Sequence, residues 1–465
     1  MQPSRLPPIT STRPEEWTYL AEGGANVVLT LGPSSSPNDS PFSDKVVRLR
    51  KRRKGAAVPG QSGPLGGDAD VDFHLSIIQP LLSDVVQLET LAVTREWLEG
   101  IDRVLNQRAS RPRVRLETDA IDLDSHSVVV AQDLVSPLRG EIAFEIKPKW
   151  GFLPSSRYLA SSTRSVKTMY CRFCMHRYYR TRSIVEHETG YCPLDLYSGD
   201  RARVRKAARA LVASWESTAG ETNNLRVFRK GVKLSPSLDR VSPFSFSREA
   251  KIKIDLVETL VASIESSRLL SNLSSLQARF DPLDIEGLAS LISSKLDIDL
   301  ADATLEPEDL ARLVGGQPTI EEWKEFLSRI EPNPSSSSSI PSSRPPIALD
   351  ESSVRDQVIS YLLSATLKDC SIMINVNDTS SRGDDVGTTT TTTRSSSSPS
   401  RRSRFDLTAI DLDPKPVSSL AKWYKLDHDI VETWREMLET LEDDDARANL
   451  RKCCSDGDVN FEGSA

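Results

Sequence analysis

The chain has 465 residues, long enough for two lobes or domains, and its 59 Lys and Arg residues against 66 Asp and Glu residues give a formal net charge of −7. This charge does not favour a general attraction for nucleic acid, so a polyanionic small molecule would have to bind in a local basic pocket. No apolar run reaches the roughly 20 residues of a membrane span, and the polar, proline-containing N-terminus is not a signal peptide. We therefore expect neither a nucleic-acid partner nor a membrane.

The cysteine content indicates a reducing compartment. Six cysteines are few for a chain of this size, and they do not form a dense disulfide framework. We expect an intracellular protein of the nucleus, the cytoplasm or both.

Residues 1–135 are predicted to form an N-terminal lobe made of a sheet and one helix. Apolar runs typical of strands occupy 26–31, 45–49 and 127–131. An apolar stripe between residues 83 and 105 predicts the helix, and the Gly- and Pro-rich stretch 53–70 predicts a disordered loop in solvent.

Two features of this lobe could hold nucleotide phosphates. Gly23 and Gly24 follow a predicted strand, so backbone N–H groups of their turn can approach phosphates without side-chain obstruction, although a glycine pair is more often only a turn. Arg48 and Arg50 share one face of a later strand. Alternatively, Arg48 begins a solvated basic run, 48–54, that ends the strand or acts as a weak nuclear-import signal.

The stretch from Glu145 to Lys149 places a carboxylate and two lysines on one predicted strand. Side chains alternate across a strand, so Glu145, Lys147 and Lys149 share a face. Two neighbouring ammonium groups repel each other unless a polyanion lies between them, and phosphate is an anion that Lys commonly binds. Taken alone, the same pattern also fits a solvated charged strand.

The second lobe, 136–465, is predicted to begin with this strand and to continue with helices. The predicted helices lie at about 203–217, 248–278 and 319–330. Two Ser- and Thr-rich segments, 332–346 and 379–404, cannot bury a core and are predicted to be disordered inserts.

Three aspartates stand beside predicted strands of this lobe. Asp411 and Asp413 follow an apolar run, 407–410, so both carboxylates can extend from one side of a strand end. Magnesium prefers one or two protein carboxylates together with nucleotide oxygens and water. Asp369 comes just before the strand-like residues 371–374, a position that is otherwise commonly a turn.

Eight short motifs follow one another in an order that resembles the inositol-pentakisphosphate 2-kinase family. They are Trp17–Leu29, Glu145–Pro154, Arg172–Arg177, Cys192–Gly199, Asn223–Phe228, Leu283–Gly287, Asp369–Ile374 and Ile410–Pro416. The resemblance implies an α+β, two-lobed inositol-phosphate-kinase-like fold, with a sheet-containing N-lobe and a larger α/β C-lobe that carries helical inositol-phosphate-binding segments. It also implies transfer of a phosphoryl group from ATP, with Mg²⁺, to the 2-hydroxyl of inositol 1,3,4,5,6-pentakisphosphate, giving inositol hexakisphosphate (phytate) and ADP, by a monomer.

The resemblance also assigns roles to individual residues. The ATP-binding residues would be Gly23, Gly24, Asn26, Arg48, Glu145, Lys147 and Asp411. Asp411 and Asp413 would hold the metal, and Asp369 and Lys147 would be catalytic. The inositol phosphate would be bound by Arg111, Lys149, Asn223, Arg226 and Lys415. Arg226 could instead contact ATP, and the neighbouring Arg108, Arg113 and Arg115 leave the register of Arg111 open.

The chain departs from the family pattern in three places. Ser419 stands where the family can carry another basic residue four positions after Lys415, and Trp423 or Tyr424 replaces a later Tyr. Cys174 stands where plant relatives carry a Lys, so one phosphate contact is missing or comes from Arg172 or Arg177. Residues 288–350 contain neither Cys nor His, so the structural zinc site that family members can carry there is lost.

A second zinc arrangement can be drawn from the sequence. Cys171, Cys174, His176, His187 and Cys192 have side chains of the types that tetrahedral zinc takes. The two closely spaced cysteines lie within a predicted helix, however, and this favours packed helix residues without metal.

Two function classes remain after the sequence is read. One is the kinase, and the other is a non-catalytic inositol-polyphosphate binding module. Glu145, Lys147, Asp369 and Asp411 occur together, which favours the kinase because anion binding alone gains nothing from adjacent carboxylates. A protein kinase is disfavoured, since the chain has neither a His-Arg-Asp catalytic loop nor an Asp-Phe-Gly triplet.

Overall fold

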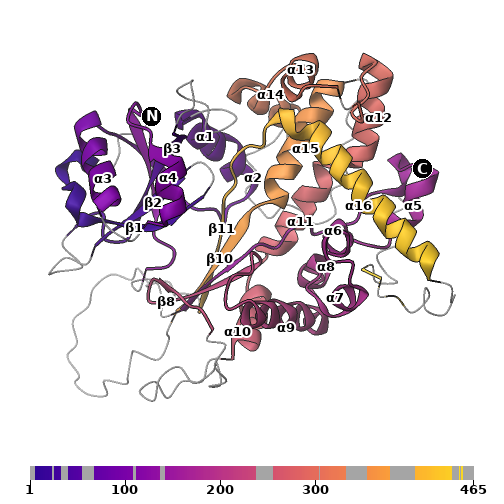
Figure 1. Cartoon of the computed structure of the whole chain (residues 1–465), viewed down its shortest axis with the longest axis horizontal. Coiled ribbons are helices and arrows are strands. Elements are labelled where there is room, and N and C mark those ends of the chain that lie inside the picture. Colours follow the sequence, from indigo (N-terminus) through magenta and orange to yellow (C-terminus); the bar gives the residue numbers. More distant parts are fainter. Residues whose placement is uncertain are drawn as a thin grey trace, which may run out of the picture.

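The fold is taken from a computed structural model of the chain (Figure 1). It describes residues 6–23, 26–32, 40–54, 67–107, 111–136, 142–236, 255–302, 304–330, 353–377, 404–441, 450 and 452–453. Helices and antiparallel sheets are both present, which confirms the predicted α+β class. Within the described part of the chain, no helix combines the length and the apolar character that crossing a membrane requires.

An antiparallel sheet of six strands is built from the N-terminal residues, and Figure 1 shows it in indigo and purple at one side of the molecule. The strands are β1 (Trp17–Glu22), β2 (Asn26–Leu31), β3 (Lys45–Arg53), β4 (Leu88–Ala92), β5 (Asp119–Ile121) and β6 (Ser127–Gln132). Their order is β1-β2-β3-β6-β4, with β5 paired to β3. The predicted strands 26–31, 45–49 and 127–131 are therefore confirmed.

One helix closes the core of this sheet. In α3 (Arg95–Gln107) the residues Leu98, Ile101 and Leu105 recur at three- and four-residue intervals, and all are buried against Val27 and Leu29 of β2. The short α4 (Arg113–Thr118) follows at the edge and leads into β5.

The helix predicted over 83–105 is wrong in its first half. Residues 88–92 form strand β4, which pairs with β6, and the helix begins only at Arg95. The preceding Val86 donates its N–H to the carbonyl of Ala409, at 3.1 Å, so this stretch also joins the second sheet. These hydrogen bonds to distant strands outweigh the apolar spacing that suggested a helix.

A short helical segment of the N-terminal part packs against the C-terminal helices. It consists of α1 (Gly67–Phe73), a π-helical turn (His74–Ile78) and α2 (Gln79–Leu81). Phe73 meets the indole of Trp323 edge to face, with the ring centroids 5.2 Å apart. Residues before 135 therefore contribute to the two largest hydrophobic clusters of the described residues.

The loop predicted at 53–70 needs a correction at both ends. Residue 53 ends β3, residue 54 is in a turn, and 67–70 belong to α1, whereas 55–66 lie outside the described residues.

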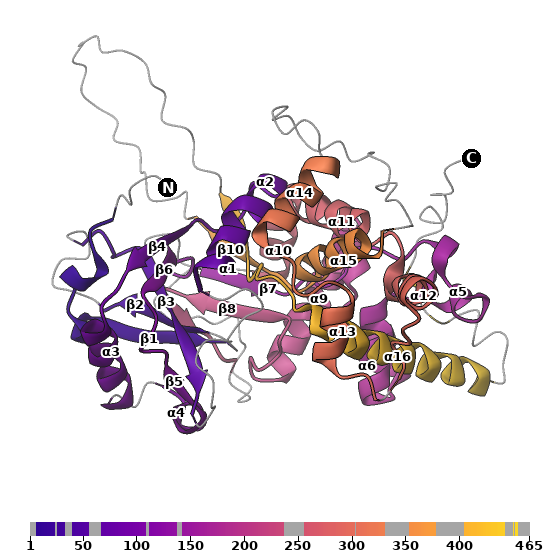
Figure 2. The same cartoon turned by 90° about the horizontal axis from the view of Figure 1, so that it is seen from above.

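The second sheet has five antiparallel strands in the order β11-β10-β7-β8-β9. They are β7 (Ile142–Ile146), β8 (Leu225–Arg229), β9 (Val232–Lys233), β10 (Ser371–Val376) and β11 (Phe405–Ile410). All residues of β7 are buried, as expected for a central strand. Figure 2 shows β7, β8 and β10 lying between the N-terminal sheet and the mass of helices.

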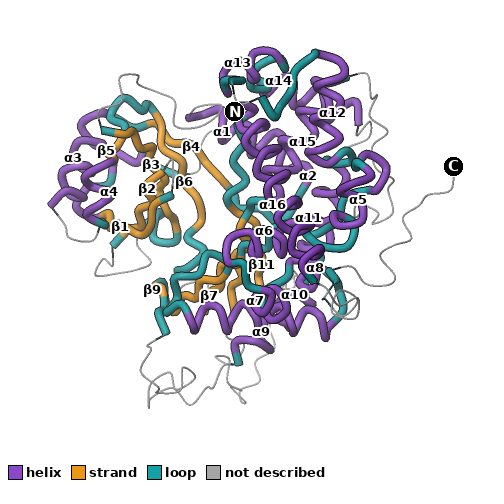
Figure 3. The backbone as a smooth tube through the Cα atoms, turned by 45° about the vertical axis from the view of Figure 1, so that its right-hand side comes forward, coloured by secondary structure: helices purple, strands orange, loops and turns teal. Residues whose placement is uncertain are grey.

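Helices make up most of the C-terminal part. They are α5 (Ser161–Lys167), α6 (Arg172–Thr181), α7 (Ile184–Thr189), α8 (Pro193–Tyr197), α9 (Arg201–Ser217), α10 (Leu256–Glu265), α11 (Leu269–Arg279), α12 (Asp284–Leu296), α13 (Pro307–Leu313), α14 (Ile320–Ile330), α15 (Val354–Lys368) and α16 (Leu420–Thr440). Short 3₁₀ turns occur at Ile9–Ser11, Pro14–Glu16, Ser156–Tyr158 and Val417–Ser419. Figure 3 shows α9 and α10 together beside the strands of the second sheet.

The helices predicted at 203–217 and 319–330 are confirmed as α9 and α14. The single helix predicted at 248–278 is wrong, because two helices, α10 and α11, are separated by residues 266–268, and 248–254 lie outside the described residues. Asp255 starts α10 by accepting the backbone N–H of Glu258, at 3.1 Å.

Both predicted inserts fall outside the described residues, except for residue 404. Asn377 donates its backbone N–H to the carbonyl of Arg404, at 2.9 Å, and so extends the ladder of β10 and β11 by one pair. The segment 378–403 therefore leaves and re-enters the fold at neighbouring points.

Candidate active site

An aspartate held between two lysines stands at the edge of the second sheet. Asp369 ends α15, Lys149 follows β7, and Lys415 follows β11. The carboxylate of Asp369 accepts hydrogen bonds from the ammonium of Lys149, at 2.9 Å, and from that of Lys415, at 2.7 Å. Three of the residues predicted for catalysis and substrate binding are thus brought together.

The two lysines set the charge state of Asp369. Burial by itself would raise the pKa of this carboxyl, but the ammonium groups of Lys415 and Lys149 outweigh it and lower the pKa to about 2. The side chain remains 51% exposed, so solvent weakens each of these effects. The direction is nevertheless set by two direct ion pairs, and the carboxylate is ionised at neutral pH.

Lys149 is held in an unusual backbone conformation. Its φ of 66° lies in the left-handed region, which side chains other than glycine seldom adopt. Its carbonyl accepts hydrogen bonds from the hydroxyl of Tyr197, at 3.2 Å, and from the amide of Gln277, at 3.1 Å. Gln277 also accepts the backbone N–H of Gly151, at 2.8 Å. These contacts from α8 and α11 fix the turn that directs the Lys149 side chain toward Asp369.

A pair of carboxylates lies next to this group. Ser371, at the start of β10, has its hydroxyl 3.1 Å from Glu145 of β7 and 3.2 Å from Asp411, which follows β11. A hydroxyl has one proton, so it donates to only one of the two carboxylates at a time. The other oxygen of Glu145 accepts from Arg226 of β8, at 2.9 Å. Antiparallel pairing places Arg226 directly opposite Glu145.

The pKa of Asp411 is raised, first by desolvation and then by the like charge of Glu145. The Asp411 residue is exposed over more than a third of its surface, so the neighbouring carboxylate is the firmer of the two causes. Lys147 and Arg48 act in the opposite direction, since their positive charges favour the ionised form. A site that concentrates carboxylates in this way is one that a divalent cation would stabilise.

Lys147 lies at the end of β7 with its side chain half-buried. Its N–H donates to the carbonyl of Asn224, at 3.1 Å, and its carbonyl accepts from the Asn224 side chain, at 3.0 Å. This double link fixes the backbone of Lys147 against the loop before β8. The preceding residue of that loop is Asn223, which is exposed, so both predicted residues lie at the same end of the sheet.

A hollow of about 160 Å³ lies among the first sheet, α1 and the residues after β11. It is lined by Asn26, Arg48, Arg50, Asp70, Val71, Leu88, Ser125, His126, Ser127, Val129 and Asp413. The guanidinium of Arg48, in the first sheet, lies 3.4 Å from the carboxylate of Asp413, which follows β11. Asn26, Arg48 and Asp413, predicted separately for nucleotide and metal, therefore share one hollow.

The glycine turn is described only in part. The N–H of Gly23 donates to the carbonyl of Asn26, at 3.0 Å, which closes the turn between β1 and β2. A Cβ at Gly23 would meet no atom within 4 Å, so steric contact does not require glycine there. Gly24 lies outside the described residues.

Arg111 does not join the other predicted substrate residues in this structure. It is buried, and its guanidinium donates to Glu22 of β1, at 2.9 Å. Arg115 and Lys51 also approach Glu22, at 3.3 and 3.9 Å. No pattern in the sequence predicts this ion cluster, because its members come from separate segments and are residue types that usually lie on the surface.

We expect Arg111→Ala to lower the free energy of unfolding by about 1–3 kcal/mol, the usual cost of leaving a buried polar group without its partner. The measurement is urea unfolding, with Arg113→Ala as the matched control, because the side chain of Arg113 is 92% exposed. The control should change the stability by less than about 0.5 kcal/mol. A rise in KM for the inositol phosphate at unchanged stability would contradict this structural role and restore Arg111 to the substrate.

A buried group of charged side chains, drawn partly from the family motifs, joins several helices of the C-terminal part. Lys167 of α5 is buried and binds Asp427 of α16, at 2.7 Å, as well as Asp284 at the start of α12. Asp427 also accepts from Arg172 of α6, at 2.8 Å, and Arg172 covers the ring of Trp150, at 5.1 Å from its centroid. Arg172 and Asp284, each from one of the family motifs, thus take part in ion pairs that join α5, α6, α12 and α16.

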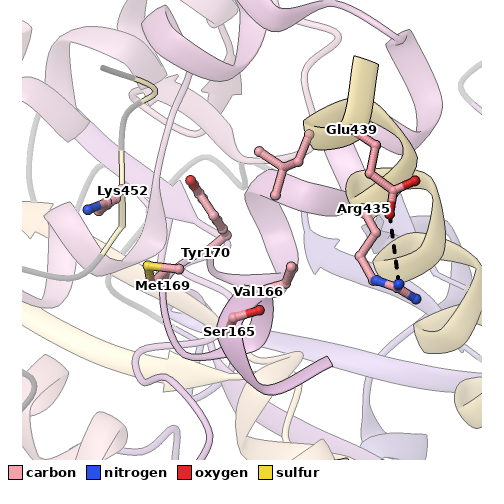
Figure 4. Close-up of a pocket in the computed structure, with 8 residues that line it drawn as sticks. Ser165, Val166, Met169, Tyr170, Arg435, Glu439 and Lys452 are labelled. Carbon is pink, nitrogen blue, oxygen red and sulfur yellow. Dashed lines mark ion pairs between the residues drawn. The ribbon is translucent and has the colours of Figure 1, made fainter. Parts of the chain in front are cut away.

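A wider hollow lies away from all these residues. It has a volume of about 430 Å³ and is lined by Ser165, Val166, Met169, Tyr170, Arg435, Leu438, Glu439 and Lys452. Figure 4 shows Arg435 and Glu439 of α16 on one side of it and Met169 and Lys452 on the other. None of its lining residues belongs to the predicted site, so size alone does not identify the site in this chain.

Basic side chains around paired carboxylates, at strand ends that face a second sheet, form the arrangement of a small-molecule kinase. A family model described as inositol-pentakisphosphate 2-kinase matches residues 19–429, and the chain belongs to this family. Curated proteins with that name are similar along most of their length. One from Cryptococcus neoformans var. neoformans is 27% identical over 93% of this chain and 96% of its own. One from Arabidopsis thaliana is 28% identical over 90% of this chain and 92% of its own.

A third protein of that name, from Danio rerio, is 32% identical over 35% of this chain and 33% of its own length. The family resemblance found in the motifs is therefore confirmed.

Proposed function

We propose that this chain transfers the γ-phosphoryl group of ATP to the 2-hydroxyl of inositol 1,3,4,5,6-pentakisphosphate, giving inositol hexakisphosphate and ADP. The observation that carries the proposal is the aspartate held by two lysines, Asp369 between Lys149 and Lys415. It lies next to a second set of carboxylates, Glu145 and Asp411, joined through Ser371. Phosphoryl transfer needs both an aligned acceptor hydroxyl and compensation of phosphate charge, and the two sets divide these tasks.

Asp369 is the residue that would receive or orient the acceptor hydroxyl. With a pKa near 2 it is ionised but a weak base while both lysines hold it. Substrate phosphates would compete for the ammonium groups of Lys149 and Lys415 and so loosen their hold on the carboxylate. Its pKa would then rise toward the ordinary value, which makes the base stronger only when substrate is bound.

Lys147 and Arg226 would meet the phosphates that move between the two substrates. The main chain of Lys147 is fixed just after β7 by hydrogen bonds to Asn224, which limits the positions that its ammonium can take. Arg226 is paired with Glu145, next to Asp411, which favours a contact with ATP over one with the inositol ring. Asn223 and Lys149 remain the inositol-phosphate residues at this edge.

The nucleotide would enter the hollow that contains Asn26, Arg48 and Asp413. At about 160 Å³ this hollow is smaller than the roughly 300–1,000 Å³ of usual ligand sites. We therefore propose that it takes the phosphates and that the adenine lies outside it. The backbone N–H groups near Gly23 would supply further donors.

Magnesium fits the donor set at the end of β11. Asp411, with Asp413 as a second ligand or a neighbour, would hold the ion through carboxylate oxygens. The raised pKa of Asp411 beside Glu145 indicates excess negative charge that a divalent cation would relieve. When bound, the ion would compensate charge on the nucleotide phosphates.

A comparison of two isomers tests the proposal. The purified chain is incubated with labelled ATP and either inositol 1,3,4,5,6-pentakisphosphate or a pentakisphosphate whose 2-position is already phosphorylated. We expect transfer to the first isomer only, with the new phosphate at position 2 by phosphorus NMR. Equal transfer to both isomers contradicts the proposed acceptor. Binding of the first isomer without any transfer would support the non-catalytic binding module instead.

We also propose that the chain acts as a monomer in the nucleus, the cytoplasm or both. Light scattering of the purified protein and imaging of a tagged chain would test these two expectations.

A further inference from the structure

Four cysteines from three distant segments meet in the interior of the C-terminal part. Cys171 and Cys174 begin α6, Cys192 precedes α8, and Cys453 follows α16 near the end of the described chain. All four are buried, and their sulfur atoms lie within 4.8 Å of one another. The active-site chemistry proposed above uses none of them.

The sulfur spacing fits a tetrahedral ion better than a disulfide. A zinc ion with four thiolates at about 2.3 Å places the sulfurs about 3.8 Å apart. The sulfurs of Cys171 and Cys192 are 3.9 Å apart. A disulfide would require about 2.0 Å between two sulfurs.

Two contacts of the sulfur atoms are of the kind that would help to hold thiolates once a cation is bound. Cys171 precedes the first turn of α6, and its sulfur accepts the backbone N–H of Cys174, at 3.4 Å. The positive end of a helix and N–H donors both stabilise a thiolate. The guanidinium of Arg177 lies 3.8 Å from the sulfur of Cys174, which adds a full positive charge.

Cys453 is brought to the group by its backbone. Its N–H donates to the carbonyl of Met169, at 2.9 Å, and its carbonyl accepts from Arg203, at 3.2 Å. These contacts anchor the segment after α16 beside the start of α6, next to the wide hollow lined by Met169 and Lys452 (Figure 4). The main chain of Cys453 is therefore held beside the start of α6 by hydrogen bonds of its own.

We propose that Cys171, Cys174, Cys192 and Cys453 bind one structural Zn²⁺ ion and so attach the C-terminal segment to α6 and α8. Four protein ligands close the coordination sphere, which is the pattern of a structural site and not of a catalytic one. Binding requires the thiols to lose their protons, so loading is coupled to proton release and strengthens as pH rises.

The sequence analysis predicted that Cys171 and Cys174 lie inside a helix, and it grouped His176 and His187 with the cysteines. In the structure Cys171 lies just before the helix, where its side chain is free to turn toward Cys192. His176 is not part of the group of four sulfurs, and its ring stacks instead on that of Tyr179, with the centroids 6.2 Å apart. The fourth ligand, Cys453, is more than 250 residues away and could not be paired from spacing.

The test is the metal content of the full chain, purified under reducing conditions without added chelator. We expect about one zinc ion per chain, released on denaturation and read with a metallochromic dye. Cys453→Ser should lose most of this zinc, and Cys453→His should keep it, since imidazole is also a zinc ligand. Cys370→Ser is the matched control and should keep its zinc, because Cys370 is buried but outside the group.

A second readout covers variants that fold poorly. The wild-type chain, stripped of metal and loaded with Co²⁺, should show the intense visible absorption of a tetrahedral tetrathiolate complex. Wild-type protein with less than about a tenth of a zinc ion per chain and no such absorption would overturn the proposal. So would full zinc content in Cys453→Ser, or a disulfide between any two of the four cysteines in the freshly purified, non-reduced protein.

Discussion

Lys147→Ala is expected to lower kcat/KM for phosphoryl transfer by about a hundredfold or more, the usual effect of removing a preorganised charged donor from a transition state. The side chain stands beside Asp411, where its positive charge favours the ionised carboxylate. Its backbone is fixed by main-chain links to Asn224 that the substitution leaves in place. The loss should therefore fall on the rate and not on folding.

The measurement is steady-state kinetics with ATP and inositol pentakisphosphate, alongside urea unfolding of the same variant. Lys233→Ala is the matched control, because Lys233 lies in the same sheet, in β9, and its ion pair within the described part of the chain is with the exposed Glu221. The control should keep its activity. Near-normal turnover in Lys147→Ala would reject the assignment of this lysine.

The roles of Asp411 and Asp369 should be distinguishable when each residue is changed to asparagine. Asp411→Asn is expected to weaken binding of Mg²⁺-ATP by at least about tenfold, since it removes a carboxylate from the metal site. Asp369→Asn should leave that affinity unchanged and lower kcat by about a hundredfold or more, as expected for a positioned base. It should not raise KM for the inositol phosphate, because Lys149 and Lys415 lose a competing anion.

Calorimetric titration of Mg²⁺-ATP and single-turnover rates measure the two effects separately. Thr408→Ser, two residue pairs before the end of β11, is a mild control for disturbance of the strand itself. Equal loss of nucleotide affinity in both aspartate variants would show that the roles are not divided in this way.

Local periodicity was enough to predict the parts of the fold whose pairing is regular. The alternation in β2 and the buried stripe of α9 are signals of one element, readable within a window of a dozen residues. The stretch before Arg95 misled the prediction, because its apolar residues serve two sheets at once. No local pattern records a hydrogen bond to a strand more than 300 residues later.

The candidate site likewise combines residues that the sequence predicts with contacts that it does not. The prediction that one strand carries Glu145, Lys147 and Lys149 is wrong after Glu145, because β7 ends at Ile146 and the backbone of Lys149 is left-handed, with a φ of 66°. The family motifs supplied Asp369 and Asp411. What could not be predicted were contacts between segments. The burial of Arg111 against Glu22 and the approach of Cys453 to Cys171 depend on tertiary packing alone.

The backbone at two of the proposed functional residues is less stable than it could be. Lys149 and Asp411 both have left-handed φ angles, 66° and 59°, and a side chain in that region costs about 1–2 kcal/mol. Glycine would remove the cost, but it would also remove the ammonium or the carboxylate. Heat resistance and turnover therefore make opposite demands at these positions. Attempts to make the protein more heat-resistant should leave both residues alone and act on the surface, where the fold has no such conflict.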